Sequence, residues 1–158
     1  MVDIQTISIA VASASVTLAA IYYVWQIRHQ TKMRQTDLLV RLFSMSMTKD
    51  FVEAWEKVAE REILDFRAYR EKYGFIEVNE VFVFLEQLGR LLQKRLIDID
   101  LIPLPFGQIK VMWEKMKTLM EDARKVWNEP KVAYGFEYLY NEMKKREQKL
   151  QQEGVRNG

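Results

Sequence analysis

The sequence predicts an all-α protein with a single N-terminal transmembrane helix that continues into a stalk, followed by a cytoplasmic helical bundle of about four helices. Residues 4–27 contain no Lys, Arg, Asp or Glu. Beyond them, apolar residues recur at three- and four-residue spacing, and the breaks between the periodic segments are short. The predicted parts are a span at 1–27, a basic juxtamembrane stalk at 28–47, the bundle at 48–145 and a polar, frayed tail at 146–158.

The predicted span has the length that a bilayer requires. As a helix, residues 4–27 would cover roughly 36 Å, against a hydrocarbon core of roughly 30 Å. Small hydroxyl side chains inside the stretch can bond back to their own helix backbone. Two alternatives stay open. A cleaved signal peptide would need a positive charge where Asp3 stands, although Ala12-Ser13-Ala14 resembles a cleavage pattern, and a buried helix of a soluble protein would be shorter.

Aromatic and basic residues mark the C-terminal end of this stretch. Aromatic rings settle at the headgroup level, and positive charge favours the cytoplasmic side. We therefore expect a single-pass protein of the cell membrane, with its N-terminus outside, its C-terminal domain in the cytoplasm and the lipid bilayer as a partner. The predicted membrane interface consists of Tyr22, Tyr23, Trp25, Arg28, Lys32 and Arg34.

Composition excludes several classes of function. The 24 basic and 22 acidic residues are interleaved, which is typical of a solvated surface and not of a nucleic-acid-binding protein. The chain has no Cys, which excludes disulfides, thiolate metal sites and cysteine catalysis. It lacks a phosphate-binding glycine loop, a G-x-S-x-G elbow and an HExxH motif. We expect no cofactor, no metal and no enzyme of a familiar design.

The soluble part is predicted to be helical throughout. Apolar residues continue the first helix through Leu39 and Phe43, and Thr48 is a candidate cap for the next helix. That helix should end near Gly74, with a candidate break at 61–65 where Asp65 could cap anew. Its expected apolar face comprises Phe51, Trp55, Val58, Ala59, Ile63, Phe66 and Tyr73.

Three further segments complete the predicted bundle. The most apolar one covers about 77–97 and should lie centrally, because its stripe is wide and includes Leu85, Leu88 and Leu96. Two prolines, Pro103 and Pro105, then break the helix. We expect helices from about 105 to 127 and from about 130 onward.

A resemblance to a known family lies in the middle of the bundle. The run VNEVFVFLEQLGRLLQKRLIDIDLI, followed by Phe106-Gly107, Trp113, Arg124 and Phe136-Glu137-Tyr138-Leu139, resembles a family of bacterial and archaeal proteins of unknown function. Glu86, Lys94-Arg95, Asp98, Asp100 and Trp113 occupy the places of that family's acidic, basic and Trp positions. The resemblance covers most of 30–140 and implies a helical domain with an N-terminal membrane helix. It implies no catalytic residues.

Few residues are candidates for chemistry. Glu86 lies within an apolar helix, where burial could make it a general acid or base. The favoured interpretation is a buried ion pair, formed by Glu86 with Arg90 one turn later or with Arg124 from another helix. Asp98 and Asp100 could suggest Mg²⁺ or Ca²⁺, but an EF-hand needs further ligands, so a helix-ending turn is favoured.

Three functional hypotheses remain. Small residues at Ser8, Ala12, Ser15 and Ala19 form a strip on one helix face, which either lets another helix approach or is merely tolerated in lipid. The favoured hypothesis is a non-catalytic accessory, scaffold or interaction subunit that contacts other transmembrane helices, as a homo-oligomer or in a larger membrane complex. The alternatives are a membrane-tethered sensor that binds a small ligand in the bundle, and an enzyme that uses Glu86, Asp98 or Asp100.

Overall fold

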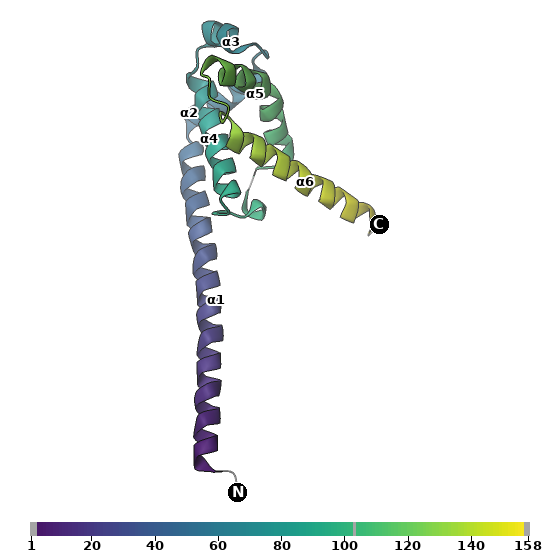
Figure 1. The fold of residues 1–158 in the computed structure, drawn as a ribbon. Helices are drawn as coiled ribbons and strands as arrows, with labels where there is room; N and C mark the ends of the chain where they lie inside the picture. Colours follow the sequence, from purple (N-terminus) through teal and green to yellow (C-terminus); the bar gives the residue numbers. More distant parts are fainter. Residues whose placement is uncertain (1–2, 103, 157–158) are drawn as a thin grey trace. The chain divides into compact units, whose positions relative to one another are not determined.

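The computed structural model describes residues 3–102 and 104–156, apart from the side chains at 5–7, 10, 45–46 and 155–156. Its order is α1 (Ile4–Ser46), α2 (Lys49–Glu60), α3 (Phe66–Tyr73), α4 (Ile76–Gln93), a 3-10 turn η1 (Ile99–Leu101), α5 (Phe106–Val126) and α6 (Tyr134–Arg156), shown in Figure 1. The described residues contain no strand, which confirms the all-α prediction.

The chain divides into two compact units, Met1–Asp37 and Leu38–Gly158. The first consists of α1 up to the boundary, and the second contains the end of α1 and all later helices. Helix α1 continues without a break to Ser46, as the sequence predicts for 28–47. Among its described residues, the second unit has five further α-helices where about four were predicted, because the candidate break at 61–65 does separate α2 from α3.

Local capping explains where α2 and α3 begin. The Thr48 side chain accepts a hydrogen bond from the Phe51 amide (3.3 Å), and the Asp65 carboxylate accepts from the amides of Arg67 and Ala68 (3.0 and 2.9 Å). Each side chain satisfies donors that a helix start leaves unpaired. Both predicted caps are confirmed. Ile63, expected in the core, lies in the connection between the two helices and is exposed.

Helix α4 ends earlier than predicted. Arg95 adopts a left-handed conformation (φ 56°), and the Leu96 amide donates back to the Leu91 carbonyl oxygen (2.9 Å). This is the hydrogen bond that closes a Schellman motif, here with Arg in the position that usually holds Gly. The turn leaves Leu96 exposed and buries Ile97, which corrects the predicted helix end at 97.

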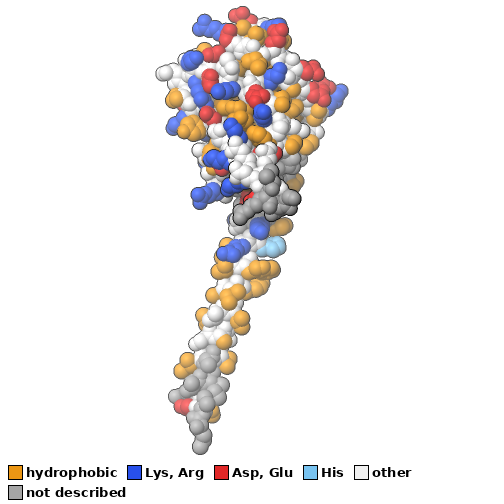
Figure 2. Space-filling model, turned by 90° about the vertical axis from the view of Figure 1, so that its right-hand side faces the viewer, with side chains coloured by type: hydrophobic (Ala, Val, Ile, Leu, Met, Phe, Trp, Pro, Cys, Tyr) orange, Lys and Arg blue, Asp and Glu red, His pale blue; other side chains and the backbone are white. Residues whose placement is uncertain are grey.

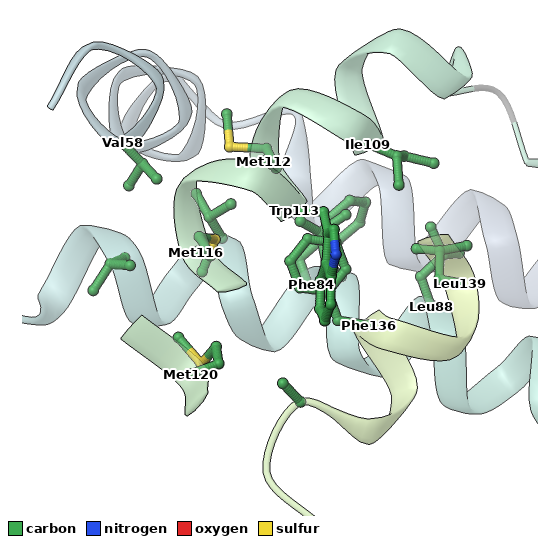
Figure 3. Close-up of a cluster of buried hydrophobic side chains, with 14 of the residues drawn as sticks. Val58, Phe84, Leu88, Ile109, Met112, Trp113, Met116, Met120, Phe136 and Leu139 are labelled. Atoms are coloured by element: carbon green, nitrogen blue, oxygen red, sulfur yellow. The ribbon is translucent and has the colours of Figure 1, made fainter. Parts of the chain in front are cut away.

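The core of the second unit is built around α4. Helix α4 packs against α2 and α6, and α5 packs against α2, α3 and α6. Figure 3 shows aromatic, aliphatic and methionine side chains from these helices meeting in one cluster. The fully buried members include Leu85, Leu88, Ile109, Met112, Met116, Met120, Phe136 and Leu139. These are the apolar positions that the helical periodicity predicts.

Helix α6 starts later and ends later than its apolar pattern suggests. Residues 130–133 form a turn, with Ala133 in a left-handed conformation (φ 62°). Among the described side chains the last buried one is Met143, yet the helix continues to Arg156 through the segment predicted to fray. Figure 1 shows this polar end of α6 leaving the packed helices of the second unit.

Candidate functional site

Two glycines bring the backbones of α4 and α6 into close contact. A Cβ atom on Gly89 would lie 1.8 Å from the Gly135 carbonyl oxygen, and one on Gly135 would lie 2.4 Å from the Glu86 carbonyl oxygen. No side chain fits at either position, because the obstructing atoms belong to the backbone. The crossing therefore requires glycine on both helices, and it fixes where α6 begins relative to α4.

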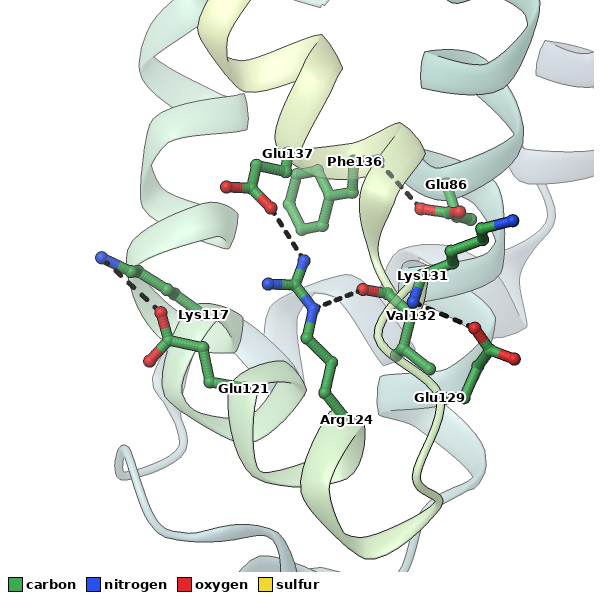
Figure 4. A network of polar contacts seen from close by, with 9 residues as sticks. All are labelled: Glu86, Lys117, Glu121, Arg124, Glu129, Lys131, Val132, Phe136 and Glu137. Carbon is green, nitrogen blue, oxygen red and sulfur yellow. Dashed lines mark hydrogen bonds and ion pairs between the residues drawn. The ribbon is translucent and has the colours of Figure 1, made fainter.

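The Glu86 carboxylate lies beside this crossing and is buried (residue 8% exposed). One oxygen accepts a hydrogen bond from the Phe136 amide (2.9 Å), and the other accepts from Arg90 Nε (2.7 Å). Figure 4 shows the carboxylate directed at the first turn of α6. A carboxylate is favourable there because the amides at a helix start are unpaired and carry partial positive charge. Glu86 thus caps a helix that begins 48 residues later in the chain, at Tyr134.

Arg124 is not part of the Glu86 pair. Its guanidinium donates to the Val132 carbonyl oxygen (2.7 Å) and to the Glu137 carboxylate (2.7 Å), as Figure 4 shows. Of the two partners predicted for Glu86, the structure places Arg90 against it and directs Arg124 to the turn before α6. The contacts of Glu86 and those of Arg124 both hold the start of α6. The residues predicted to form one ion pair therefore stabilise the same junction through separate bonds.

Asp98 and Asp100 form a structural turn. The Asp98 carboxylate accepts from the Asp100 amide (3.2 Å) and caps η1, while Asp100 pairs with Arg146 of α6 (2.8 Å). Within the described residues, no group of three His, Cys, Asp or Glu side chains is arranged to hold a metal ion. Asp100 therefore ties the loop after α4 to the middle of α6.

A second polar junction was not predicted from the sequence. Glu77, in the first turn of α4, accepts from Lys57 (3.4 Å) and contacts Arg61 (3.4 Å). The Arg61 guanidinium lies 4.9 Å from the Tyr73 ring centre. The pKa of the Glu77 carboxyl is held below its usual value by a hydrogen bond with its own backbone amide and by the two cations. This junction links α2, α3 and α4.

The six predicted membrane-interface residues lie on α1, and all are exposed. Ring contacts join Tyr22 to Tyr23 (6.2 Å), Tyr22 to Trp25 (6.4 Å) and Trp25 to His29 (5.7 Å). Figure 2 shows hydrophobic side chains along the visible face of this helix. The interface residues that follow, Arg28, Lys32 and Arg34, are also exposed.

The predicted small-residue strip is exposed as well, at Ser8, Ala12, Ser15 and Ala19. Its hydroxyl groups bond to their own helix: Ser8 Oγ donates to the Ile4 carbonyl oxygen (3.0 Å) and Ser15 Oγ to that of Val11 (2.8 Å).

The described side chains do not include a candidate membrane span. Among them, no helix combines the length and the apolar character needed to cross a bilayer. Gln5, Thr6, Ile7 and Ala10 of the predicted span lie outside the described side chains. The predicted span is therefore not supported by this finding and stays a prediction.

An apolar pocket of about 270 Å³ lies in the second unit. Aromatic rings form much of its wall: Phe84 contacts Phe43 (5.4 Å between ring centres) and Phe51 (5.2 Å), both edge to face. The helical periodicity of the sequence predicts that these rings lie in the core, but it does not predict a pocket between them. The pocket is lined by Phe43, Met47, Phe51, Val52, Trp55, Glu56, Phe84, Leu104 and Gln108.

These features define a small all-α domain whose polar junctions are structural, joined to an apolar helical segment. The chain belongs to the family described as Domain of unknown function (DUF4760), which matches residues 9–143. The predicted resemblance to a family of unknown function is confirmed to that extent, while the membrane anchor attached to it is not. No curated protein and no solved structure matches the chain.

Proposed function

We propose that this chain is a non-catalytic interaction protein of the cell membrane. In this proposal, residues 4–27 cross the bilayer with the N-terminus outside, and the helical domain from Leu38 onward serves in the cytoplasm as an accessory or scaffold element. The observation that carries the proposal is the apolar surface of α1, which nothing described within its own unit covers.

The apolar side chains of this segment are exposed on every side of the helix. Large ones are between 52% and 79% exposed: Ile4, Ile9, Val11, Val16, Leu18, Ile21, Tyr22, Tyr23, Val24, Trp25 and Ile27. A helix that is apolar all round is normally buried in a protein core or in lipid. Contiguous apolar surface of this kind marks a membrane or protein contact. A bilayer would cover all sides of the helix at once.

Polar groups in the segment are compatible with lipid. The hydroxyl groups of Ser8, Ser15 and Thr17 each donate to a carbonyl oxygen one turn earlier. A hydroxyl that is satisfied within its own helix costs less to remove from water than one without a partner. The basic residues from Arg28 to Arg34 favour placing the C-terminal side in the cytoplasm.

The non-catalytic part of the proposal rests on how the acidic candidates are used. Glu86 caps α6, Asp98 caps η1 and Asp100 binds Arg146. Each of these three candidate carboxylates already has a structural partner. These stabilising contacts explain why acidic residues stand at the three positions, so no catalytic role is needed to explain them.

A partner helix is the second element of the proposal. The strip of Ser8, Ala12, Ser15 and Ala19 presents small side chains at three- and four-residue steps. Small residues let helix backbones approach closely in lipid, where packing drives association. We propose that this strip contacts a second copy of the chain or a helix of a larger membrane complex.

Membrane extraction of the full-length chain tests the anchor. We expect the protein to sediment with membranes and to resist alkaline carbonate, and to be released by mild detergent. Leu18→Arg should release it, because a charge near the middle of a span costs about 3 kcal/mol. Ile76→Arg is the matched control, since Ile76 is also exposed (76%, against 67% for Leu18) but lies in the second unit. Recovery of the unaltered protein in the soluble fraction would contradict the proposal.

A further inference from the structure

The pocket between α2, α4 and the start of α5 combines an aromatic wall with one charge. Its rings are Phe43, Phe51, Trp55 and Phe84, and they form a connected series because Phe51 contacts both Trp55 (6.1 Å) and Phe84 (5.2 Å). Among the described residues of the lining, Glu56 is the single charged one, next to Trp55 in α2. All of these residues belong to the second unit, including Phe43 near the C-terminal end of α1.

The carboxylate at this pocket has no internal partner. In the described part of the chain, Glu56 makes no ion pair or hydrogen bond, whereas its neighbours Glu53 and Lys57 pair with Lys49 and Glu77. The lining contains no Lys or Arg. An anionic ligand would therefore meet a like charge and no cation. A neutral apolar ligand could occupy the aromatic wall but would gain nothing from the carboxylate.

Aromatic rings and a carboxylate together recognise organic cations. Ring faces attract a positive charge, most strongly Trp, and a carboxylate adds a direct ion pair. The Gln108 side chain at the same pocket adds a neutral polar group. The volume of about 270 Å³ is close to the lower limit of ligand pockets and suits a small molecule.

We propose that this pocket binds a small organic amine whose apolar body packs against Phe51, Trp55 and Phe84 and whose ammonium group pairs with Glu56. A bound amine would also contact α2, α4 and the loop before α5 together. Binding would then stabilise the second unit through elements that are distant in the sequence.

Calorimetric titration of the full-length chain in neutral detergent tests this inference with three probes of similar shape. They are 2-phenylethylamine, which is cationic at neutral pH, neutral 2-phenylethanol and anionic 3-phenylpropanoate. We expect saturable binding of the amine, at least about fivefold tighter than that of the alcohol, and none of the anion. Partition into detergent is the same for every protein variant, so differences between variants report on the pocket.

Protein variants identify the groups that bind the amine. Glu56→Gln should remove most of the preference for the amine, leaving only the weaker attraction of the ring faces, and should leave alcohol binding unchanged. Glu60→Gln, one turn later on α2 and outside the lining, removes the same charge and should leave the preference for the amine intact. Val52→Trp should fill the space and abolish binding of both probes.

Three results would overturn the inference. One is the absence of saturable amine binding below about 1 mM. Another is equal binding of amine and alcohol to the unaltered protein. The third is an amine preference that Glu56→Gln leaves undiminished, which would place the cation elsewhere. Membrane extraction tests α1 separately, so failure here leaves the proposed anchor standing, and the reverse holds as well.

Discussion

The segment up to Asp37 and the unit from Leu38 onward use the same kind of residue in opposite ways. Both are helical and rich in apolar side chains, but Leu88 in α4 is fully buried whereas Leu18 in α1 is 67% exposed. In the second unit, helices from distant parts of the chain cover one another. In the first, a single helix has nothing described within its own unit to cover it. The difference shows that helical periodicity predicts helices without saying what surrounds them.

The largest expected effect compares the same substitution in both regions. Leu88→Ala should lower the free energy of unfolding of the second unit by about 3 kcal/mol, because it removes buried contacts and leaves a cavity. Leu18→Ala should change it by less than about 0.5 kcal/mol. Urea unfolding followed by tryptophan fluorescence measures both. A similar loss for the two variants would mean that α1 is also packed against the domain.

A second comparison concerns the crossing of α4 and α6. Gly135→Ala should destabilise the second unit by about 3 kcal/mol, since the new methyl group would meet the Glu86 carbonyl oxygen and the backbones must separate. Gly107→Ala, in the first turn of α5, has no atom within 4 Å of the added group and should be neutral or slightly stabilising. Thermal unfolding measures the stability of the two variants, and Gly135→Ala should have the lower melting temperature. Equal melting temperatures would contradict the close approach of the helices.

Much of the second unit could be predicted from neighbouring residues alone. The caps at Thr48 and Asp65, the break at Pro105 and the pairing of Glu86 with Arg90 each depend on residues within a few positions of one another. The Glu86 bond to the Phe136 amide, the contact of Gly89 with Gly135 and the Glu77 junction join segments far apart. These features depend on how whole helices pack, for which spacing in the sequence carries no signal.

A third prediction isolates the carboxylate at the start of α6. Glu86→Gln keeps the shape of the side chain but removes the negative charge that interacts favourably with the unpaired amides at the start of α6. We therefore expect the free energy of unfolding to fall by about 2 kcal/mol. Glu121→Gln is the control, because Glu121 makes an exposed pair with Lys117 (3.8 Å) that contributes little. Hydrogen exchange at the Phe136 amide should accelerate in the Glu86 variant. An unchanged exchange rate would argue against the cap.

The smallest effect is a pH dependence of the second unit. The pKa of Glu77 is lower in the folded chain than its usual value of 4.5, so its contribution to stability is present above that value and is lost as the pH falls through the folded pKa. Glu77→Gln should therefore flatten the decline in melting temperature below about pH 4.5. Lys72 lowers the pKa of Glu62 as well, but that pair is exposed, and Glu62→Gln should change the decline less. An identical decline in both variants would contradict the prediction.

Labelling from the two sides of the membrane tests the central claim about residues 4–27 most directly. The chain has no Cys, so Asp3→Cys and Lys149→Cys each carry a single thiol on opposite sides of the predicted span. In intact spheroplasts of an expressing bacterium, a membrane-impermeant maleimide should label the Asp3→Cys variant and leave the Lys149→Cys variant unlabelled. After permeabilisation, it should label both. If both thiols are protected before permeabilisation and both react after it, residues 4–27 do not cross the membrane.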